Sequence, residues 1–240
     1  MPKYLMANVL FAAEIKYPYT LELFKDYIYN GNSEANVVFK VSQEDIEREK
    51  QISLSYEELP EYPDPYLESL ALFRKFNTYL LENGLGTVFH SSAVELDGNA
   101  YLFIGKSGAG KSTHARLWTE FFKGKANIIN DDKPVIVKSN ANYLVCGTPF
   151  TGKHHVGENK NAKIKAICEI VQSKVNKIEL LSGSEAIAVV LNQTIRSERK
   201  DSAKKLLGFL IGLLGNIKVY RLYCDTSYDA VKVCYNKVSE

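Results

Sequence analysis

The stretch "YLFIGKSGAGKSTHARLW", residues 101–118, decides how the rest of the chain is interpreted. Its first residues form an apolar run that predicts a strand, and the spacing of apolar residues from Lys111 onward predicts a helix that ends at Gly124. The segment between strand and helix is rich in glycine, serine and lysine. Glycine lets the backbone turn tightly and brings successive N–H groups close to a bound anion without a Cβ in the way.

Four positions in this segment, Gly105, Gly110, Lys111 and Ser112, match the pattern G-x-x-x-x-G-K-[ST] of phosphate-binding loops. We call residues 105–110 the glycine loop. In this pattern the lysine binds the β- and γ-phosphates, the hydroxyl ligates Mg²⁺, and the N-terminus of the following helix faces the same anion. The sequence therefore predicts a nucleoside triphosphate and Mg²⁺, with binding residues Gly105, Lys106, Ser107, Gly108, Ala109, Gly110, Lys111, Ser112 and Thr113.

Two consecutive aspartates, Asp131 and Asp132, end the apolar run of "ANIINDDKP" about twenty residues after the glycine loop. Successive side chains on a strand point in opposite directions, so one carboxylate can face a metal ion and the other a substrate. A kinase needs both, since one carboxylate helps Ser112 to hold Mg²⁺ and the other accepts the proton of the attacking hydroxyl. The alternative is a solvated turn before a proline, and the sequence leaves open which aspartate takes which role.

Residues 88–137 resemble the catalytic domain of HPr kinase/phosphorylase and, more distantly, the nucleotide site of phosphoenolpyruvate carboxykinase. The resemblance is carried by His90 before a strand, by the glycine loop with Lys111 and Ser112, and by the pair Asp131 and Asp132. It implies ATP- and Mg²⁺-dependent phosphorylation of a serine hydroxyl on a small protein or peptide. It also implies that the two aspartates divide the roles of general base and metal ligand between them, and that His90 lies close by. The alternative for His90 is a hydrogen-bonded histidine of the core.

Downstream, HPr kinases carry a Glu-Ile-Arg-Gly segment where this chain reads "GTPFTGKHHVGENKN", residues 147–161. Lys153 stands where that arginine would be, as a point charge rather than a bidentate fork. It joins Asp131, Asp132 and His90 in the predicted catalytic set. His154 and His155 beside it indicate an exposed loop rather than a metal site, because no third ligand has suitable spacing.

Some further residues carry two interpretations each. Arg116, in the helix after the glycine loop, reaches the nucleotide or lies on the surface. Lys133 pairs with the aspartates or contacts the transferred phosphate. Arg196 is a candidate phosphate clamp, although a surface arginine is the more usual case. Trp118 shares a helix face with Ala115 and is predicted to lie in the core.

The fold class predicted for the chain is α/β, with a mixed, twisted β-sheet flanked by helices in a P-loop core over residues 63–240. Residues 1–62 are predicted to form a small β-rich accessory region without a counterpart to the HPr kinase N-terminal domain. Its predicted strands lie in "YLMANVLF", "NVVFKV" and "QISLSY". A helix is predicted over residues 66–84, and a tight hairpin turn at Asp97-Gly98, a pair that accepts positive φ.

Charge and cysteine content restrict the class of protein. Thirty Lys and Arg against 28 Asp and Glu leave a formal net charge of +2 over 240 residues, which indicates neither a nucleic-acid partner nor a membrane. Four widely spaced cysteines without a C-x-x-C pair predict reduced core thiols and a cytoplasmic location. The apolar run over 206–215 has about half the length needed to cross a bilayer.

Two functions compete with the kinase hypothesis. One is a nucleotide sensor or assembly module that binds ATP without transferring phosphate, although such a module has no need for two carboxylates. The other is phosphoryl transfer to a small carbon acid, as in phosphoenolpyruvate carboxykinase, for which the chain has little room. The sequence names neither the phosphate acceptor nor the oligomeric state, so a homo-oligomer stays open.

Overall fold

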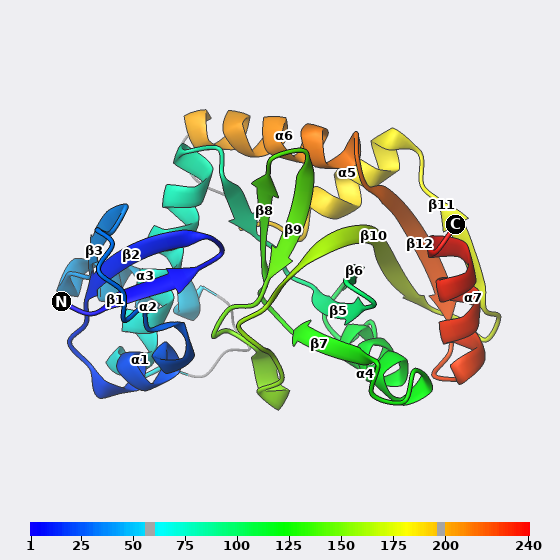
Figure 1. Cartoon of the computed structure of the whole chain (residues 1–240), viewed down its shortest axis with the longest axis horizontal. Coiled ribbons are helices and arrows are strands. Elements are labelled where there is room, and N and C mark those ends of the chain that lie inside the picture. Colours follow the sequence, from blue (N-terminus) through cyan, green and yellow to red (C-terminus); the bar gives the residue numbers. More distant parts are fainter. Residues whose placement is uncertain (56–60, 196–199) are drawn as a thin grey trace. The chain divides into compact units, whose positions relative to one another are not determined.

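The structure is a computed structural model that describes residues 1–55, 61–195 and 200–240. The chain divides into two compact units, Met1–Leu80 and Leu81–Glu240 (Figure 1). The sequence also predicts a domain boundary after residue 62, and this boundary stays a prediction. Arg196, the candidate phosphate clamp, lies outside the described residues.

The first unit contains a three-stranded sheet in the order β1-β2-β3, in which β1 is antiparallel and β3 parallel to β2. The prediction of a strand in "QISLSY" is wrong, because residues 51–54 belong to helix α2 (Gln43–Leu54). Ser42 begins that helix with a capping box, in which its hydroxyl accepts from Asp45 N (3.2 Å) and its own N–H donates to the Asp45 carboxylate (2.8 Å). The elements of this unit are β1 (Lys3–Met6), β2 (Val9–Glu14), α1 (Pro18–Leu23), η1 (Lys25–Tyr27), β3 (Val37–Lys40), α2 (Gln43–Leu54) and α3 (Asp64–Glu82).

Helix α3 confirms the helix predicted over residues 66–84 and also organises the start of α1. Its Glu68 is buried, and the carboxylate accepts the N–H groups of Lys16 (2.8 Å) and Tyr17 (3.1 Å) and the hydroxyl of Thr20 (2.7 Å). Tyr17, the residue before α1, has no side-chain cap of its own. Glu68 therefore satisfies backbone donors that a helix start otherwise leaves to water.

The second unit is built on one mixed sheet in the order β4-β8-β9-β10-β6-β5-β7. Strand β12 pairs with residues 166–172 of β10, and β11 pairs with β12. Together with the small N-terminal sheet, this mixed sheet confirms the predicted α/β class. Asp97 (φ 50°) and Gly98 (φ 79°) form the predicted turn between β5 and β6. The strands are β4 (Gly86–Val88), β5 (Ser92–Leu96), β6 (Asn99–Ile104), β7 (Ala126–Asn130), β8 (Val135–Ser139), β9 (Asn142–Cys146), β10 (Asn161–Gln172), β11 (Lys177–Leu180) and β12 (Lys218–Cys224).

Helices cover both faces of this sheet and enclose two hydrophobic cores (Figure 1). Helices α5 (Gly183–Leu191) and α6 (Lys200–Leu214) pack on one face, and α4 (Lys111–Phe121) and α7 (Tyr228–Val238) on the other. Alternate residues of β6 serve the two cores, as the period of a strand requires. Trp118 is fully buried in the α4–α7 core, as predicted, and the four cysteines are free and buried.

Strand β10 forms the centre of the sheet and contains a bulge. Ile164 pairs with Ala100 of β6, and Ala166 with the next residue, so Lys165 is an extra residue without a partner on β6. Before the bulge, Ile164 faces the α5–α6 core, and after it Ile167 does so. The bulge thus changes which residues of β10 face each core.

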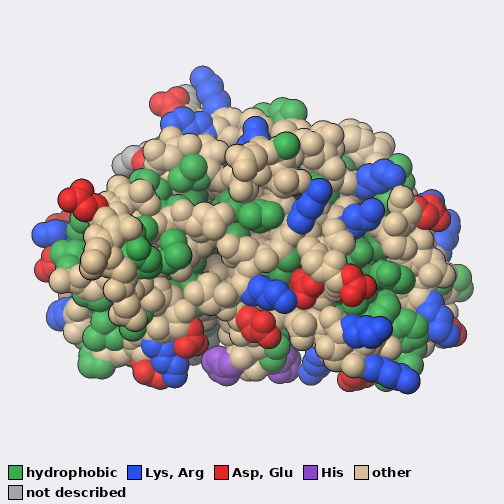
Figure 2. Space-filling view, viewed as in Figure 1, with side chains coloured by type: hydrophobic (Ala, Val, Ile, Leu, Met, Phe, Trp, Pro, Cys, Tyr) green, Lys and Arg blue, Asp and Glu red, His purple; other side chains and the backbone are tan. Residues whose placement is uncertain are grey.

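The surface shows no segregation of charge on the face drawn in Figure 2, where acidic and basic side chains are interspersed. This distribution agrees with the small formal net charge of +2. Among the helices of the described part of the chain, none combines the length and apolar character that crossing a bilayer requires.

Candidate active site

The carboxyl ends of four strands meet at one end of the second unit's sheet. Strands β6, β10 and β12 are mutually parallel, and β7 runs the same way because both β6 and β7 are antiparallel to β5. The glycine loop follows β6, and Asp131 and Asp132 follow β7 two strands away. At a spacing of ~4.8 Å between neighbouring strands, β6 and β7 lie about 10 Å apart. Open α/β sheets bind ligands at this end of their strands.

The glycine loop has a backbone that only glycine adopts readily. Gly105, Gly108 and Gly110 have φ values of 146°, 75° and 104°. A Cβ at Gly105 would lie 3.1 Å from the carbonyl oxygen of Ile170 on the neighbouring strand β10, so this glycine also permits close packing. Gly110 is the residue before α4, which begins at Lys111 as the sequence predicts. The loop therefore opens directly onto a helix N-terminus.

Lys111 is buried, and its ammonium lies within the glycine loop. The Nζ atom donates to the carbonyl oxygens of Gly105 (3.1 Å) and Lys106 (3.3 Å). Burial lowers the pKa of Lys111, while the charges of Asp132 and Asp131 act in the opposite direction. The lysine of the loop and the two aspartates are thus electrostatically coupled across the sheet end.

A side-chain turn sets the direction of the chain after β7. The Oδ1 atom of Asn130 accepts the N–H groups of Asp132 (2.9 Å) and Lys133 (2.8 Å). Its Nδ2 donates to the carbonyl oxygen (3.0 Å) and the hydroxyl oxygen (3.2 Å) of Thr148, and Thr148 Oγ1 donates to Lys133 O (2.7 Å). Both Asn130 and Thr148 are fully buried, so this network fixes where the aspartates lie.

The two aspartates have different surroundings. Asp131 is buried, and its Oδ1 accepts the hydroxyl of Ser92 (2.6 Å), which begins β5 next to the end of β7. Asp132 is more exposed, with His90 Nε2 3.3 Å from Oδ1 and Lys133 Nζ 3.6 Å from Oδ2. Burial raises the pKa of Asp132, but the hydrogen bond from His90 and the charge of Lys133 outweigh it and hold that pKa below its ordinary value. Asp132 is therefore ionised at neutral pH.

Lys153, the remaining predicted catalytic residue, lies on the short helix η2 (Gly152–His154). Gly152 has φ 72°, and a Cβ there would lie 2.9 Å from Cβ of Asp132, so the start of η2 packs directly against this aspartate. Lys153 itself is exposed, as are His154 and His155. The structure places Lys153 on the turn beside Asp132, and its catalytic role stays a prediction.

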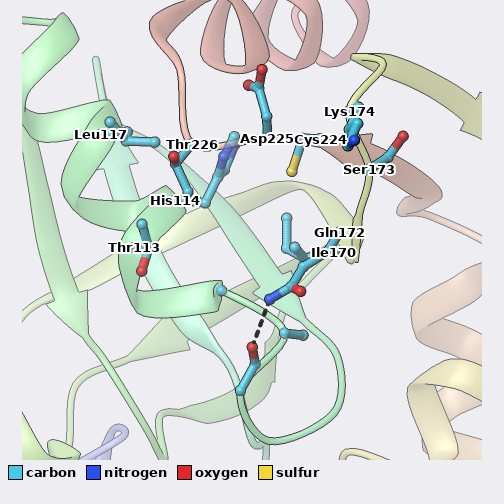
Figure 3. A pocket seen from close by; sticks show the side chains of 13 residues that line it. Thr113, His114, Leu117, Ile170, Gln172, Ser173, Lys174, Cys224, Asp225 and Thr226 are labelled. Carbon is cyan, nitrogen blue, oxygen red and sulfur yellow. Dashed lines mark hydrogen bonds between the residues drawn. The ribbon is translucent and has the colours of Figure 1, made fainter.

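A cleft of about 580 Å³ opens on the other side of the glycine loop (Figure 3). The loop and the first turns of α4 form one wall, and the ends of β10 and β12 with the segments after them form the other. Arg116 is exposed and does not line the cleft. The lining residues are Gly108, Ala109, Gly110, Thr113, His114, Leu117, Ile170, Gln172, Ser173, Lys174, Cys224, Asp225 and Thr226.

The residues at this sheet end fit a polyphosphate with Mg²⁺. The positive φ values of the glycines allow the tight turns in which loop N–H groups face a bound anion, and Lys111 supplies a cation inside the loop. Within the described ranges, no group of three His, Cys, Asp or Glu side chains could hold a metal ion by itself. A magnesium ion would therefore depend on Ser112, an aspartate and phosphate oxygens together, which are the oxygen ligands that it prefers.

Four positioning residues were not singled out in the sequence: Ser92, Asn130, Thr148 and Gly152. Asn130 carries a local signal, because an asparagine before "DDKP" favours a side-chain turn. Ser92, Thr148 and Gly152 act through partners that are distant in sequence, and no local pattern indicates them.

Comparison with known proteins gives limited similarity. No protein-family model matches the chain, and no curated protein matches it. Among solved structures, the chain is similar to the HPr(Ser) kinase/phosphatase from Coxiella burnetii, with a TM-score of 0.35 and 10% sequence identity. The similarity covers 62% of this chain and 95% of that chain.

Proposed function

We propose that this protein is an ATP- and Mg²⁺-dependent kinase that transfers the γ-phosphate to a hydroxyl group, a serine of a small protein or peptide. The observation that carries the proposal is that the glycine loop, with Lys111 Nζ inside it, and the pair Asp131 and Asp132 follow strands that end at the same end of the sheet. A phosphate-binding cation and two carboxylates are the groups that phosphoryl transfer to a hydroxyl requires. The serine acceptor rests on the resemblance of residues 88–137 to HPr kinases.

The different surroundings of the two aspartates support a division of roles. Asp132 is the more exposed carboxylate, is ionised at neutral pH and lies beside His90, so we assign it as the general base. Asp131, held by Ser92, is assigned to the metal side together with Ser112. Bound Mg²⁺ would neutralise charge on the phosphates. Lys153, on the turn against Asp132, is assigned to the transferred phosphate.

The transfer step follows from these assignments. Asp132 accepts the proton of the acceptor hydroxyl, whose oxygen forms the new bond to the γ-phosphorus as the bond to the leaving oxygen of ADP breaks. Lys111 and the N–H groups of the glycine loop stabilise the charge that grows on that leaving oxygen. The products are ADP and a phosphoserine, and Asp132 returns its proton to water.

A transfer assay tests this function. The full chain with γ-labelled ATP and Mg²⁺ is offered HPr, free serine and peptides from a lysate, beside the variants Lys111→Ala and Asp132→Asn. We expect label on one acceptor, lost in Lys111→Ala and reduced roughly 10²- to 10⁴-fold in Asp132→Asn while ATP binding persists. Lys125→Ala and Asp97→Asn, at exposed positions away from the site, serve as matched controls.

Two outcomes would contradict the proposal. Tight ATP binding without label on any acceptor would favour the sensor or assembly module. Full transfer by Asp132→Asn would remove Asp132 as the base, and full transfer by both Asp131→Asn and Asp132→Asn would overturn the kinase mechanism.

A further inference from the structure

The glycine loop has two unlike flanks. The aspartates lie on the β7 side, and the 580 Å³ cleft lies on the side of β10 and β12. A nucleotide held by the loop must direct its terminal phosphate toward the aspartates if they are to act on it. Its nucleoside then leaves the loop on the opposite flank, where the cleft is.

Strands β10 and β12 extend beyond the end of β6, where the glycine loop begins, and form a wall on that flank. Ile104, the last residue of β6, pairs with Glu169, whereas β10 continues to Gln172 and pairs there with Cys224 of β12. Three further residues at ~3.3 Å each carry these strands about 10 Å past the start of the loop. This overhang is comparable to the length of a nucleoside's sugar and base, and its inner surface is the far wall of the cleft.

Hydrogen bonds hold both walls in place, so the cleft is preformed. Gln172 Nε2 donates to Gly108 O (3.0 Å) and ties the end of β10 to the glycine loop. The segments after β10 and β12 are joined by Asn176 Nδ2 to Asp225 Oδ1 (3.1 Å) and by Asp225 N to Asn176 Oδ1 (3.0 Å). Ser173 N donates to Cys224 O (2.9 Å). Preformed pockets of 300–1,000 Å³ are typical of small-molecule sites.

The lining combines apolar surface with hydroxyl and carboxylate groups. Leu117 and Ile170 offer apolar contact to a flat ring, and Ser173 and Thr226 offer hydroxyls (Figure 3). Asp225 Oδ1 accepts from Asn176, Ser227 N (3.0 Å) and Ser227 Oγ (2.6 Å), and none of these three bonds uses Oδ2. A carboxylate oxygen is also the group that accepts ribose hydroxyls in dinucleotide-binding sites.

One buried group in this lining lacks a partner. His114 Nε2 accepts the indole N–H of Trp118 (3.0 Å), so in the neutral ring Nδ1 carries the proton. His114 is 2% exposed, and Nδ1 has no hydrogen-bond partner among the described residues. Buried donors are normally satisfied, so an orphaned donor in a cleft wall indicates a place for an acceptor from a ligand or water.

We infer that this cleft binds the nucleoside of the nucleotide whose phosphates the glycine loop holds. The inference rests on the proposed function, since it places the remainder of the same ligand. The base lies against Leu117 and Ile170, and the ribose lies toward Thr226 and Asp225.

The test separates the nucleoside from the phosphates by comparing ATP with inorganic tripolyphosphate, each titrated with Mg²⁺ into the full chain by calorimetry. Thr226→Trp fills the cleft from an exposed position. Val175→Trp adds the same bulk to the segment after β10 but outside the lining, and serves as the control. We expect Thr226→Trp to weaken ATP binding at least tenfold and to leave tripolyphosphate binding unchanged within twofold. We expect Val175→Trp to change the binding of neither ligand.

Each outcome distinguishes the two claims. Wild-type protein that binds tripolyphosphate as tightly as ATP, or Thr226→Trp that retains full ATP affinity, would overturn the nucleoside site and leave the phosphate site standing. Wild-type protein that binds neither probe, or a Lys111→Ala variant that binds both undiminished, would overturn the proposed function and the nucleoside site with it.

Discussion

His90 Nε2 lies 3.3 Å from Oδ1 of Asp132, and two backbone hydrogen bonds keep the segments of these residues together. Phe89 N donates to Pro134 O (2.9 Å) and Ser91 N to Asp132 O (3.1 Å), one on each side of His90. The backbone therefore fixes the position of His90 independently of its side chain. His90 can be replaced without removing what holds the two segments in place.

This arrangement predicts a pH effect for His90→Ala. His90 helps to hold the pKa of Asp132 below its ordinary value, so its loss raises that pKa. A base with a higher pKa is protonated at higher pH, so the acid limb of kcat shifts to higher pH. The pH profile of phosphate transfer checks this, with His90→Gln as the conservative variant that restores part of the shift. An unshifted acid limb in His90→Ala would show that the base is another group.

His114 predicts a loss of stability in acid. Burial lowers its pKa from 6.5 to about 4, so the native protein resists a proton that the unfolded chain accepts. Stability from this group is complete above pH 6.5 and falls as the pH drops toward 4, by about 3 kcal/mol in total. His114→Gln keeps a hydrogen-bond acceptor for Trp118 but does not titrate. Urea unfolding at pH 7 and pH 4.5 should show a larger decrease for wild type than for this variant, and equal decreases would contradict the prediction.

Lys111→Ala should separate binding from stability. Without nucleotide, the native protein holds a buried ammonium whose pKa burial lowers, and alanine is the better helix former. We expect the free energy of unfolding to stay the same or to rise by up to about 1 kcal/mol, while tripolyphosphate affinity falls roughly 10- to 100-fold. Urea unfolding and calorimetry on the same preparation measure both. A strongly destabilised variant would mean that Lys111 has a structural role instead.

Gly152→Ala tests the packing of η2 against Asp132. Alanine must adopt φ 72° and place a Cβ 2.9 Å from that of Asp132. We expect a loss of about 1–2 kcal/mol in unfolding free energy and a lower kcat for transfer with ATP affinity retained. Gly183→Ala is the matched control, because Gly183 lies at the start of α5 with open space around it. A Gly152→Ala protein with wild-type stability and turnover would show that η2 can move away without consequence.

The fold was predictable where local patterns and tertiary structure agree. The strand–loop–helix around Lys111 and the turn at Asp97-Gly98 follow from residues that are adjacent in sequence. The strand prediction for "QISLSY" failed because residues 51–54 form the end of α2, whose beginning is specified by the Ser42 capping box. Helix α5 was not predicted, although Ser182 and Glu185 form the same kind of capping box before it.

The candidate site was predictable only in its chemical groups. The aspartates, His90 and the glycine loop are visible as motifs, and the sheet brings them to one end. The Asn130–Thr148 network and the contact of Gly152 with Asp132 join segments that are separated in sequence. Such contacts depend on strand order, which a single sequence does not specify.

The unpaired Lys165 in β10 has a consequence for how this chain can change in length. Lys165 is exposed and belongs to neither core, and Ile164 and Ile167 on its two sides face the same core although they are three residues apart. Deletion of Lys165 would place Ile167 two residues after Ile164, so the ordinary alternation of a strand would keep Ile167 facing the α5–α6 core and Cys168 facing the α4–α7 core. The pairs that β10 makes with β6 on the two sides of the bulge would stay the same, so this central strand can lose Lys165 without exchanging the faces of its other side chains.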